Sequence, residues 1–158
     1  MKNPKQGQSF KGEKYMKIRV LLVDDEKEFT DVLANRLATR DFEVIKALSA
    51  DEALAQINEK AIDVIILDVL MPGKDGITTL REIKQLKPLI EVIMLTGNAT
   101  VASGVAGMKL GAYDYLMKPT DTKDLVEKIE KAYKRKVEQE ERIRQAEIER
   151  IMLKRGWD

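Results

Sequence analysis

Three acidic residues follow an apolar run near the start of the chain. Residues 20–26 read VLLVDDE, so Val23 is followed by Asp24, Asp25 and Glu26. Carboxylates placed together make one another harder to ionise unless a cation lies among them. A hydrated surface turn is the ordinary explanation of such a group. A site for a divalent cation is the functional one, because Mg²⁺ is commonly bound by one or two carboxylates together with water molecules.

Further polar residues stand at the ends of other apolar runs. Asp68 ends the run VIILD, Thr96 follows EVIML, and Lys118 follows YDYLM and precedes Pro119. Each is a weak signal by itself, since aspartate is common in turns and a terminal threonine or lysine is usually structural or solvated. Together they offer a carboxylate that can act as a nucleophile, and a hydroxyl and an ammonium that can bind the oxygens of an anion.

Short apolar runs alternate with amphipathic segments from residue 18 onward. Runs that are apolar throughout are typical of strands buried on both faces, and their alternation with helices predicts a parallel sheet built from βαβ units. In such a sheet the functional groups lie beyond the carboxyl ends of the strands. We therefore expect Asp24, Asp25, Asp68, Thr96 and Lys118 to converge there. The expected strands are 18–23, 42–48, 64–69, 91–95 and 113–117, and the expected helices are about 27–40, from Ser49 with Glu52 as a capping box, about 76–86, about 99–109, and from Asp121 or Thr122.

The composition is that of a globular domain and limits the available chemistry. Of the 158 residues, 44% are hydrophobic and 35% are charged, and the formal net charge of +1 gives no overall attraction to nucleic acid or membrane. The chain has no cysteine and no histidine, which excludes disulfides, thiolate or imidazole metal sites and the commonest general base. Without an apolar signal core or spanning segment, we expect a cytoplasmic protein with no membrane insertion.

As a set, the motifs resemble those of the receiver domain of two-component response regulators. The matching stretches are VDDE, ILDVLMPGKDG, LTG and GAYDYLMKP, and the similarity covers about residues 17–133. This resemblance implies a doubly wound α/β fold of the flavodoxin-like type. Its five-stranded parallel sheet would have the order 2-1-3-4-5, with helices on both faces. It also implies that the chain is no enzyme toward other substrates and catalyses only its own phosphotransfer and autodephosphorylation.

The resemblance assigns a role to each residue at the strand ends. Asp68 would accept a phosphoryl group from the phosphohistidine of a sensor histidine kinase or phosphotransfer protein. Thr96 would hydrogen-bond that group and Lys118 would pair with it, while Thr96 and Tyr115 would be the switch residues. The expected cofactor is Mg²⁺, with ligands from Asp24, Asp25, Asp68 and the backbone carbonyl of Leu70.

The chain is expected to have three parts: a loose arm at 1–15, the receiver at 16–133 and a helical extension at 134–158. The extension reads KRKVEQEERIRQAEIERIMLKRGWD, which is too short for a DNA-binding output domain, so no direct contact with nucleic acid is expected. It is either a solvated helix rich in charge pairs or a docking, dimerising or linker helix. The expected partner surface for a downstream protein or for self-association is this helix or the face formed by 99–109, 113–117 and the last helix.

Other functions on the same architecture fit the residues less well. A phosphatase of the haloacid-dehalogenase type needs a second aspartate two residues after the nucleophile, where this chain has Leu70. A dinucleotide- or flavin-binding module needs a glycine-rich phosphate loop after the first strand, where this chain has the acidic VDDE. A degenerate receiver that acts only by binding remains an alternative that phosphorylation would exclude.

Overall fold

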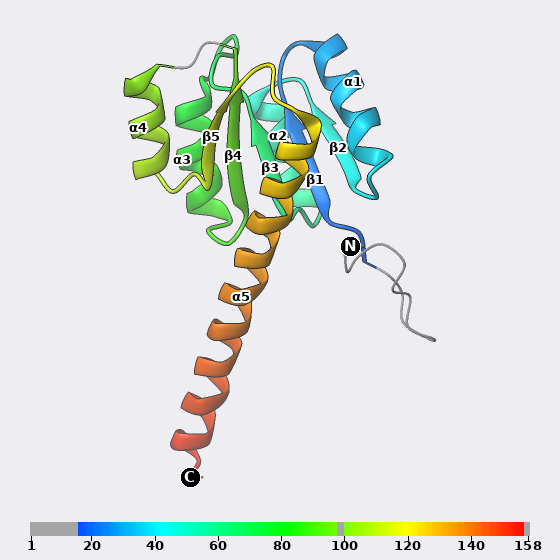
Figure 1. Ribbon diagram of the computed structural model, residues 1–158. Helices are drawn as coiled ribbons and strands as arrows, with labels where there is room; N and C mark the ends of the chain where they lie inside the picture. Colours follow the sequence, from blue (N-terminus) through cyan, green and yellow to red (C-terminus); the bar gives the residue numbers. More distant parts are fainter. Residues whose placement is uncertain (1–15, 98–99, 157–158) are drawn as a thin grey trace.

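The computed structural model describes residues 16–97 and 100–156 (Figure 1), so the arm expected at 1–15 lies outside the described residues. Its strands are β1 (Arg19–Val23), β2 (Glu43–Ala47), β3 (Val64–Leu67), β4 (Glu91–Thr96) and β5 (Asp114–Met117). Its helices are α1 (Lys27–Ala38), α2 (Ala50–Glu59), α3 (Gly76–Leu86), α4 (Val101–Lys109) and α5 (Thr122–Lys154). Each expected element is present, with ends that differ by a few residues at most.

The strands form one parallel sheet in the order β2-β1-β3-β4-β5, which confirms the expected topology. All four neighbouring pairs run parallel. Because β1 and β3 lie side by side at the centre, the residues that follow them, Asp24 and Asp68, meet at the same edge of the sheet. Figure 1 shows this edge at the top of the molecule.

Helices cover both faces of the sheet, and each face has its own apolar core. Leu21 and Val23 of β1 pack in the layer that contains α2 and α3, whereas Val20 and Leu22 pack in the layer that contains α1 and α5. All four side chains are almost completely buried. Burial of such a side chain contributes about 1.5–3 kcal/mol. A shift in the register of β1 would lose several of these contributions, so the position of Asp24 at the end of the strand is fixed.

Side-chain caps start most of the helices, but not α1. Half of the expected capping box of α2 is present: Ser49 Oγ accepts from the Glu52 N–H at 3.1 Å, but the Glu52 carboxylate accepts from the N–H of Leu48, at 2.7 Å, one residue before the N-cap. At the start of α1, Glu26 makes no side-chain cap. Its carboxylate is therefore available to the functional site. The side chains that do cap are Ser49, Asp75, Thr100 and Asp121.

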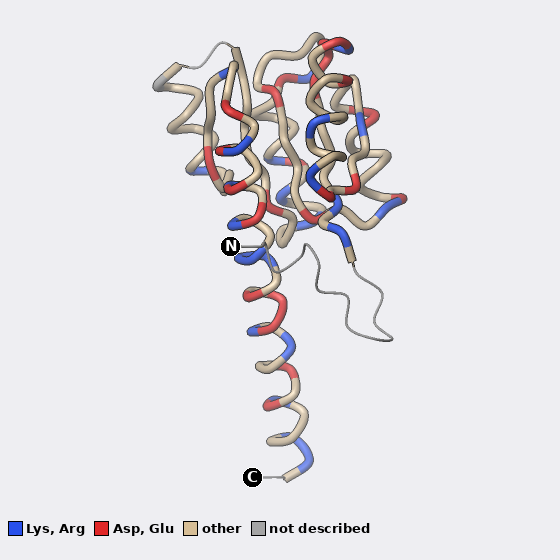
Figure 2. The backbone as a smooth tube through the Cα atoms, turned by 45° about the vertical axis from the view of Figure 1, so that its right-hand side comes forward, with Lys and Arg blue, Asp and Glu red and all other residues tan. Residues whose placement is uncertain are grey.

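The last helix runs far beyond the body of the domain, on the side opposite the carboxyl ends of the strands (Figure 1). At about 1.5 Å per residue, α5 is about 50 Å long. Figure 2 shows acidic and basic residues interleaved along the projecting part. Its aliphatic residues are exposed there, namely Val137, Ile143, Ile148, Ile151, Met152 and Leu153. Within the described ranges, none of the helices combines the length and apolarity needed to cross a membrane.

Two buried carboxylates anchor α5 where it leaves the domain. Glu91, 2% exposed at the start of β4, pairs with the Arg135 guanidinium, whose Nη2 lies 2.8 Å from Oε1, and with Lys84 of α3 at 3.5 Å. Asp63, 6% exposed, pairs with Lys136 at 3.2 Å. The helix crosses residue 133 without interruption, so the first residues of the expected extension are ionic partners of the receiver core.

We expect Arg135→Ala to lower the free energy of unfolding by about 1–3 kcal/mol, because a buried carboxylate loses a charged hydrogen-bond donor and keeps only Lys84. Arg142→Ala removes the same kind of side chain from an exposed position on the same helix and should change stability by less than about 0.5 kcal/mol. Urea unfolding followed by circular dichroism compares the two variants. Equal effects would show that Arg135 does not anchor the helix.

Candidate functional site

Three carboxylates meet beyond the ends of β1 and β3. Oxygen atoms of Asp24, Asp25 and Asp68 all lie within 4.8 Å of one another. Asp24 and Asp68 are each 4% exposed, whereas Asp25 is exposed. Backbone bonds of the sheet continue one residue past the strands, from Asp24 N to Ala47 O at 3.1 Å and from Asp68 N to Val23 O at 2.9 Å. The sheet itself therefore holds the two buried carboxylates in place.

Lys118 brings a positive charge into this group from the end of β5. Its Nζ lies 2.6 Å from Asp24 Oδ2 and 3.7 Å from Asp68 Oδ2. The Lys118 N–H donates to the carbonyl of Thr96 at 2.8 Å, which ties the start of this loop to β4. The following peptide bond, to Pro119, is cis. The Lys118 ammonium, which follows the edge strand β5, thus offsets part of the repulsion expected among the carboxylates.

Burial and charge shift the pKa values of this pair. Burial raises the pKa of Asp24; hydrogen bonds from Lys118 and the Glu26 N–H oppose the rise, while the charge of Asp68 adds to it. For Lys118, burial lowers the pKa, but hydrogen bonds to Asp24 and Glu26 and the charges of Asp24 and Asp68 outweigh that effect, and the net pKa is raised. Lys118 is therefore held in its charged form. Its single charge does not fully offset the cost of burying Asp24 beside another carboxylate, and that condition favours binding of a divalent cation.

The donor set fits Mg²⁺. All three side chains offer hard oxygen ligands, and a shallow pocket of about 360 Å³ is lined by two of them, Asp25 and Asp68. The residues around it are Asp25, Glu26, Asp68, Leu70, Thr96 and Gly97. The Leu70 N–H donates to Asp68 Oδ1 at 3.2 Å and fixes that carboxylate, while the Leu70 carbonyl as a ligand stays a prediction. Thr96, 1% exposed at the end of β4, contributes to the wall of the pocket.

Comparison with known proteins decides the family. Residues 20–130 match the family model described as response regulator receiver domain. The chain belongs to this family. The transcriptional regulatory protein ZraR of Salmonella typhimurium is 42% identical over 116 residues, which is 73% of this chain but 26% of ZraR, so the chain spans about a quarter of that relative.

Solved structures agree with this assignment. A CheY-like receiver domain protein from Methanospirillum hungatei has a TM-score of 0.76 and 31% identity, and the match covers 78% of this chain and 99% of that one. A response regulator from Burkholderia pseudomallei, solved with a phosphorylated aspartic acid, calcium ion and citrate, has a TM-score of 0.69 and 25% identity. That match covers 89% of this receiver chain and 87% of the other protein. The protein is thus a response regulator receiver of a two-component system.

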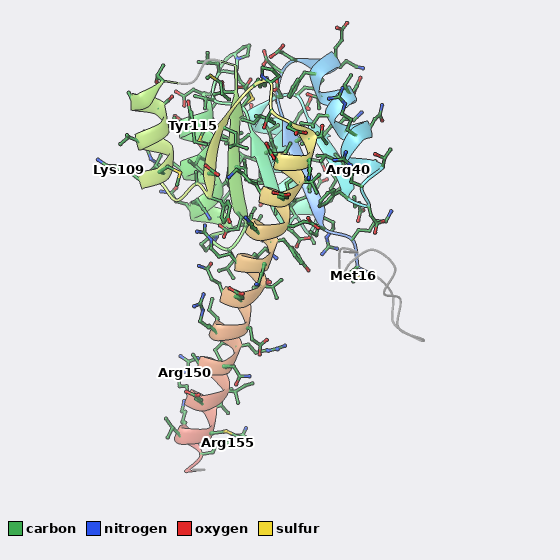
Figure 3. All side chains as sticks on the ribbon, viewed as in Figure 1. Met16, Arg40, Lys109, Tyr115, Arg150 and Arg155 are labelled. Carbon is green, nitrogen blue, oxygen red and sulfur yellow. The ribbon has the colours of Figure 1, made fainter. Side chains whose placement is uncertain are left out.

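Tyr115 lies apart from the carboxylate pocket of this receiver, between β5 and α4 (Figure 3). Its hydroxyl is 2.5 Å from the Ser103 Oγ of α4, and Ser103 also belongs to the capping box that starts this helix. A Cβ added at Gly104 would lie 3.7 Å from the Tyr115 ring, so the helix packs closely on the ring. The structure therefore places Thr96 at the pocket and Tyr115 against α4.

Several residues that support the site escaped the sequence analysis. Glu26 Oε1 accepts from Lys118 Nζ at 3.0 Å. The same Nζ lies over the Phe29 ring, 4.2 Å from the ring centroid. Gly76 is required beside Asp68, because an added Cβ would lie 2.3 Å from the Asp68 backbone oxygen. A signal for Glu26 was present, since it follows the acidic pair directly; the role of Phe29 depends on how α1 packs against the β5–α5 loop.

Proposed function

We propose that this receiver accepts a phosphoryl group on Asp68 from the phosphohistidine of a sensor histidine kinase or phosphotransfer protein. The observation that carries the proposal is the position of Asp68, within 4.8 Å of two further carboxylates and 3.7 Å from the Lys118 ammonium. A carboxylate oxygen attacks phosphorus, the bond from phosphorus to the imidazole nitrogen breaks, and an acyl phosphate forms. The chain turns over no other substrate in this scheme.

Each neighbour of Asp68 has a task in the transfer. Asp24, Asp25, Asp68 and the Leu70 carbonyl would hold Mg²⁺, which offsets negative charge on the phosphoryl oxygens when it is bound. The Lys118 ammonium pairs with one of those oxygens, and the Thr96 hydroxyl donates to another. The Leu70 N–H keeps Asp68 oriented through Oδ1. The phosphorylated aspartic acid and calcium ion named for the Burkholderia protein support this arrangement.

The direct test is incubation of the protein with acetyl phosphate and Mg²⁺, followed by intact-mass measurement. Gain of a single phosphoryl mass that depends on Mg²⁺ and is prevented by a chelator supports the proposal. No gain under conditions that phosphorylate a known receiver would favour the alternative of a receiver that acts only by binding.

We infer that the signal leaves through the face formed by α4, β5 and α5. Apolar side chains are exposed on α4 and β5, with Val105 at 48%, Met108 at 49% and Met117 at 57%. Within this face, the Tyr115 hydroxyl connects β5 to the first turn of α4 by its hydrogen bond with Ser103. A hydroxyl of Thr96 drawn to the phosphoryl group would free space toward which the Tyr115 ring can move, and α4 would lose the bond from Ser103.

Hydrogen exchange should therefore change in α4, β5 and the first turns of α5 when beryllofluoride and Mg²⁺ are added. Amides of α2, which lies near the other edge of the sheet, should change little and act as the internal control. Tyr115→Ala should reduce the change in α4, since the link to Ser103 is gone. A change confined to α2 and α3 would refute this output route.

The extension provides a second surface through which the receiver can act. Its exposed aliphatic residues and interleaved charges suit a docking, self-associating or linker helix. ZraR is named as a transcriptional regulatory protein, and this chain matches about a quarter of it. That this chain makes no direct contact with nucleic acid and works in the cytoplasm stays a prediction.

A further inference from the structure

The Lys118 side chain is held from three directions in addition to its contact with Asp68. Asp24 accepts from its ammonium at 2.6 Å and Glu26 at 3.0 Å, both from the β1–α1 segment. The ring of Phe29, in the first turn of α1, lies below the ammonium at 4.2 Å. One short stretch of chain, residues 24–29, therefore supplies all three of these contacts to Lys118.

Of the two partners of the ammonium other than the aspartates, Phe29 is held more firmly than Glu26. The Glu26 carboxylate is 65% exposed, and an ion pair with so exposed a partner contributes little because water screens it. Phe29, in contrast, is half-buried and packs against the apolar core under α1 and α5. An ammonium over a partly desolvated ring is attracted to the ring face. The ring therefore supports the ammonium in the position where Asp24 accepts its hydrogen bond at 2.6 Å.

The resting place of Lys118 matters because it uses an oxygen of the metal cluster. Asp24 Oδ1 accepts from the Glu26 N–H at 2.9 Å, and Oδ2 accepts from Lys118. A divalent cation coordinated by Asp24 must share one of these oxygens, and it would be repelled by an ammonium only a few ångströms away. Whatever holds Lys118 on Asp24 consequently opposes metal binding.

We propose that Phe29 is a positioning residue: its ring holds the Lys118 ammonium on Asp24 and so lowers the Mg²⁺ affinity of the receiver. The inference rests on the proposed function only in that Mg²⁺ binds at the carboxylate cluster. It needs no phosphorylation, so it can be tested by binding alone.

The experiment is a double-mutant cycle on the full chain, with Mg²⁺ affinity measured by NMR titration of backbone amides near the cluster. Phe29→Leu in the wild-type chain should bind Mg²⁺ about two- to fivefold more tightly, because the cation–π contact is lost while the apolar volume is largely kept. The same substitution in a Lys118→Ala background should leave the affinity unchanged. Phe29→Tyr, which keeps a ring under the ammonium, should bind as the wild type does.

A second measurement is made first on the wild-type chain, where its main result does not depend on the stability of a variant. Before Mg²⁺ is added, the ε-methylene protons of Lys118 should show an upfield ring-current shift, which Mg²⁺ should reduce and Phe29→Leu should abolish. Normal lysine shifts in the wild type would overturn the inference, as would an equal effect of Phe29→Leu in both backgrounds. Wild-type protein that bound no Mg²⁺ would overturn the metal part of the proposed function as well, which distinguishes the two failures.

Discussion

Asp68→Asn should abolish the Mg²⁺-dependent gain of a phosphoryl mass from acetyl phosphate. The amide has nearly the same shape, and its oxygen can still accept from the Leu70 N–H, which bonds Asp68 Oδ1 at 3.2 Å. It lacks the anionic oxygen that attacks phosphorus, so the loss should be complete rather than partial. Intact-mass measurement over a time course, with and without Mg²⁺, gives the result directly.

The matched control is Asp75→Asn, a substitution of the same type in the loop that follows Asp68. Asp75 caps α3 by accepting from the Thr78 N–H at 2.8 Å, and asparagine caps helices about as well. This variant should be phosphorylated like the wild type. Labelling that persists in Asp68→Asn, or disappears equally in both variants, would contradict the assignment of Asp68 as the phosphoacceptor.

The fold and the convergence of the site follow from strong local signals in the sequence. β3 is apolar throughout and β1 is apolar from Val20 to Val23, a pattern that predicts central parallel strands buried on both faces. Once the strands are known, parallel geometry brings Asp24 and Asp68 to one edge without further information. The same reasoning gives Thr96, which ends β4, and Lys118, which directly follows β5.

The contacts that tune the site could not be predicted in the same way. Phe29 reads as a core residue of an amphipathic helix, and only the packing of α1 beside the β5–α5 loop places its ring under Lys118. Ser103 reads as an ordinary residue of a helix start, yet it bonds the Tyr115 hydroxyl across 12 positions of sequence. Arg135 lies in a stretch of mixed charge, where nothing in the pattern marks its buried partner Glu91. Such pairs depend on side-chain directions between elements, which periodicity does not specify.

Two cations, one within α5 and one before it, also have different expected consequences. Arg135, within α5, pairs with Glu91 at the start of β4, away from the pocket at the carboxyl ends of the strands, so its loss should affect stability. Lys118 lies in the loop between β5 and α5 and contacts Asp24 and Asp68 directly. In the proposed function, a change in charge at Asp68 would therefore act on β5 and the start of α5 through Lys118.

Lys118→Ala should keep Mg²⁺ binding but remove most of the conformational response to beryllofluoride. Removal of an ammonium 2.6 Å from Asp24 leaves the carboxylates uncompensated, so Mg²⁺ affinity should be kept or should rise, by up to about tenfold, which corresponds to about 1.4 kcal/mol. The response of α4, β5 and α5 to beryllofluoride should nevertheless be largely lost, because no group on the β5 side is left to pair with the added charge on Asp68.

Lys123→Ala removes the same charge from an exposed position at the start of α5 and should leave both properties unchanged. NMR titration with Mg²⁺ and hydrogen exchange with beryllofluoride measure the two properties on the same samples. A Lys118→Ala variant that lost Mg²⁺ binding but responded normally at saturating metal would show that the lysine supports the metal site and not the switch.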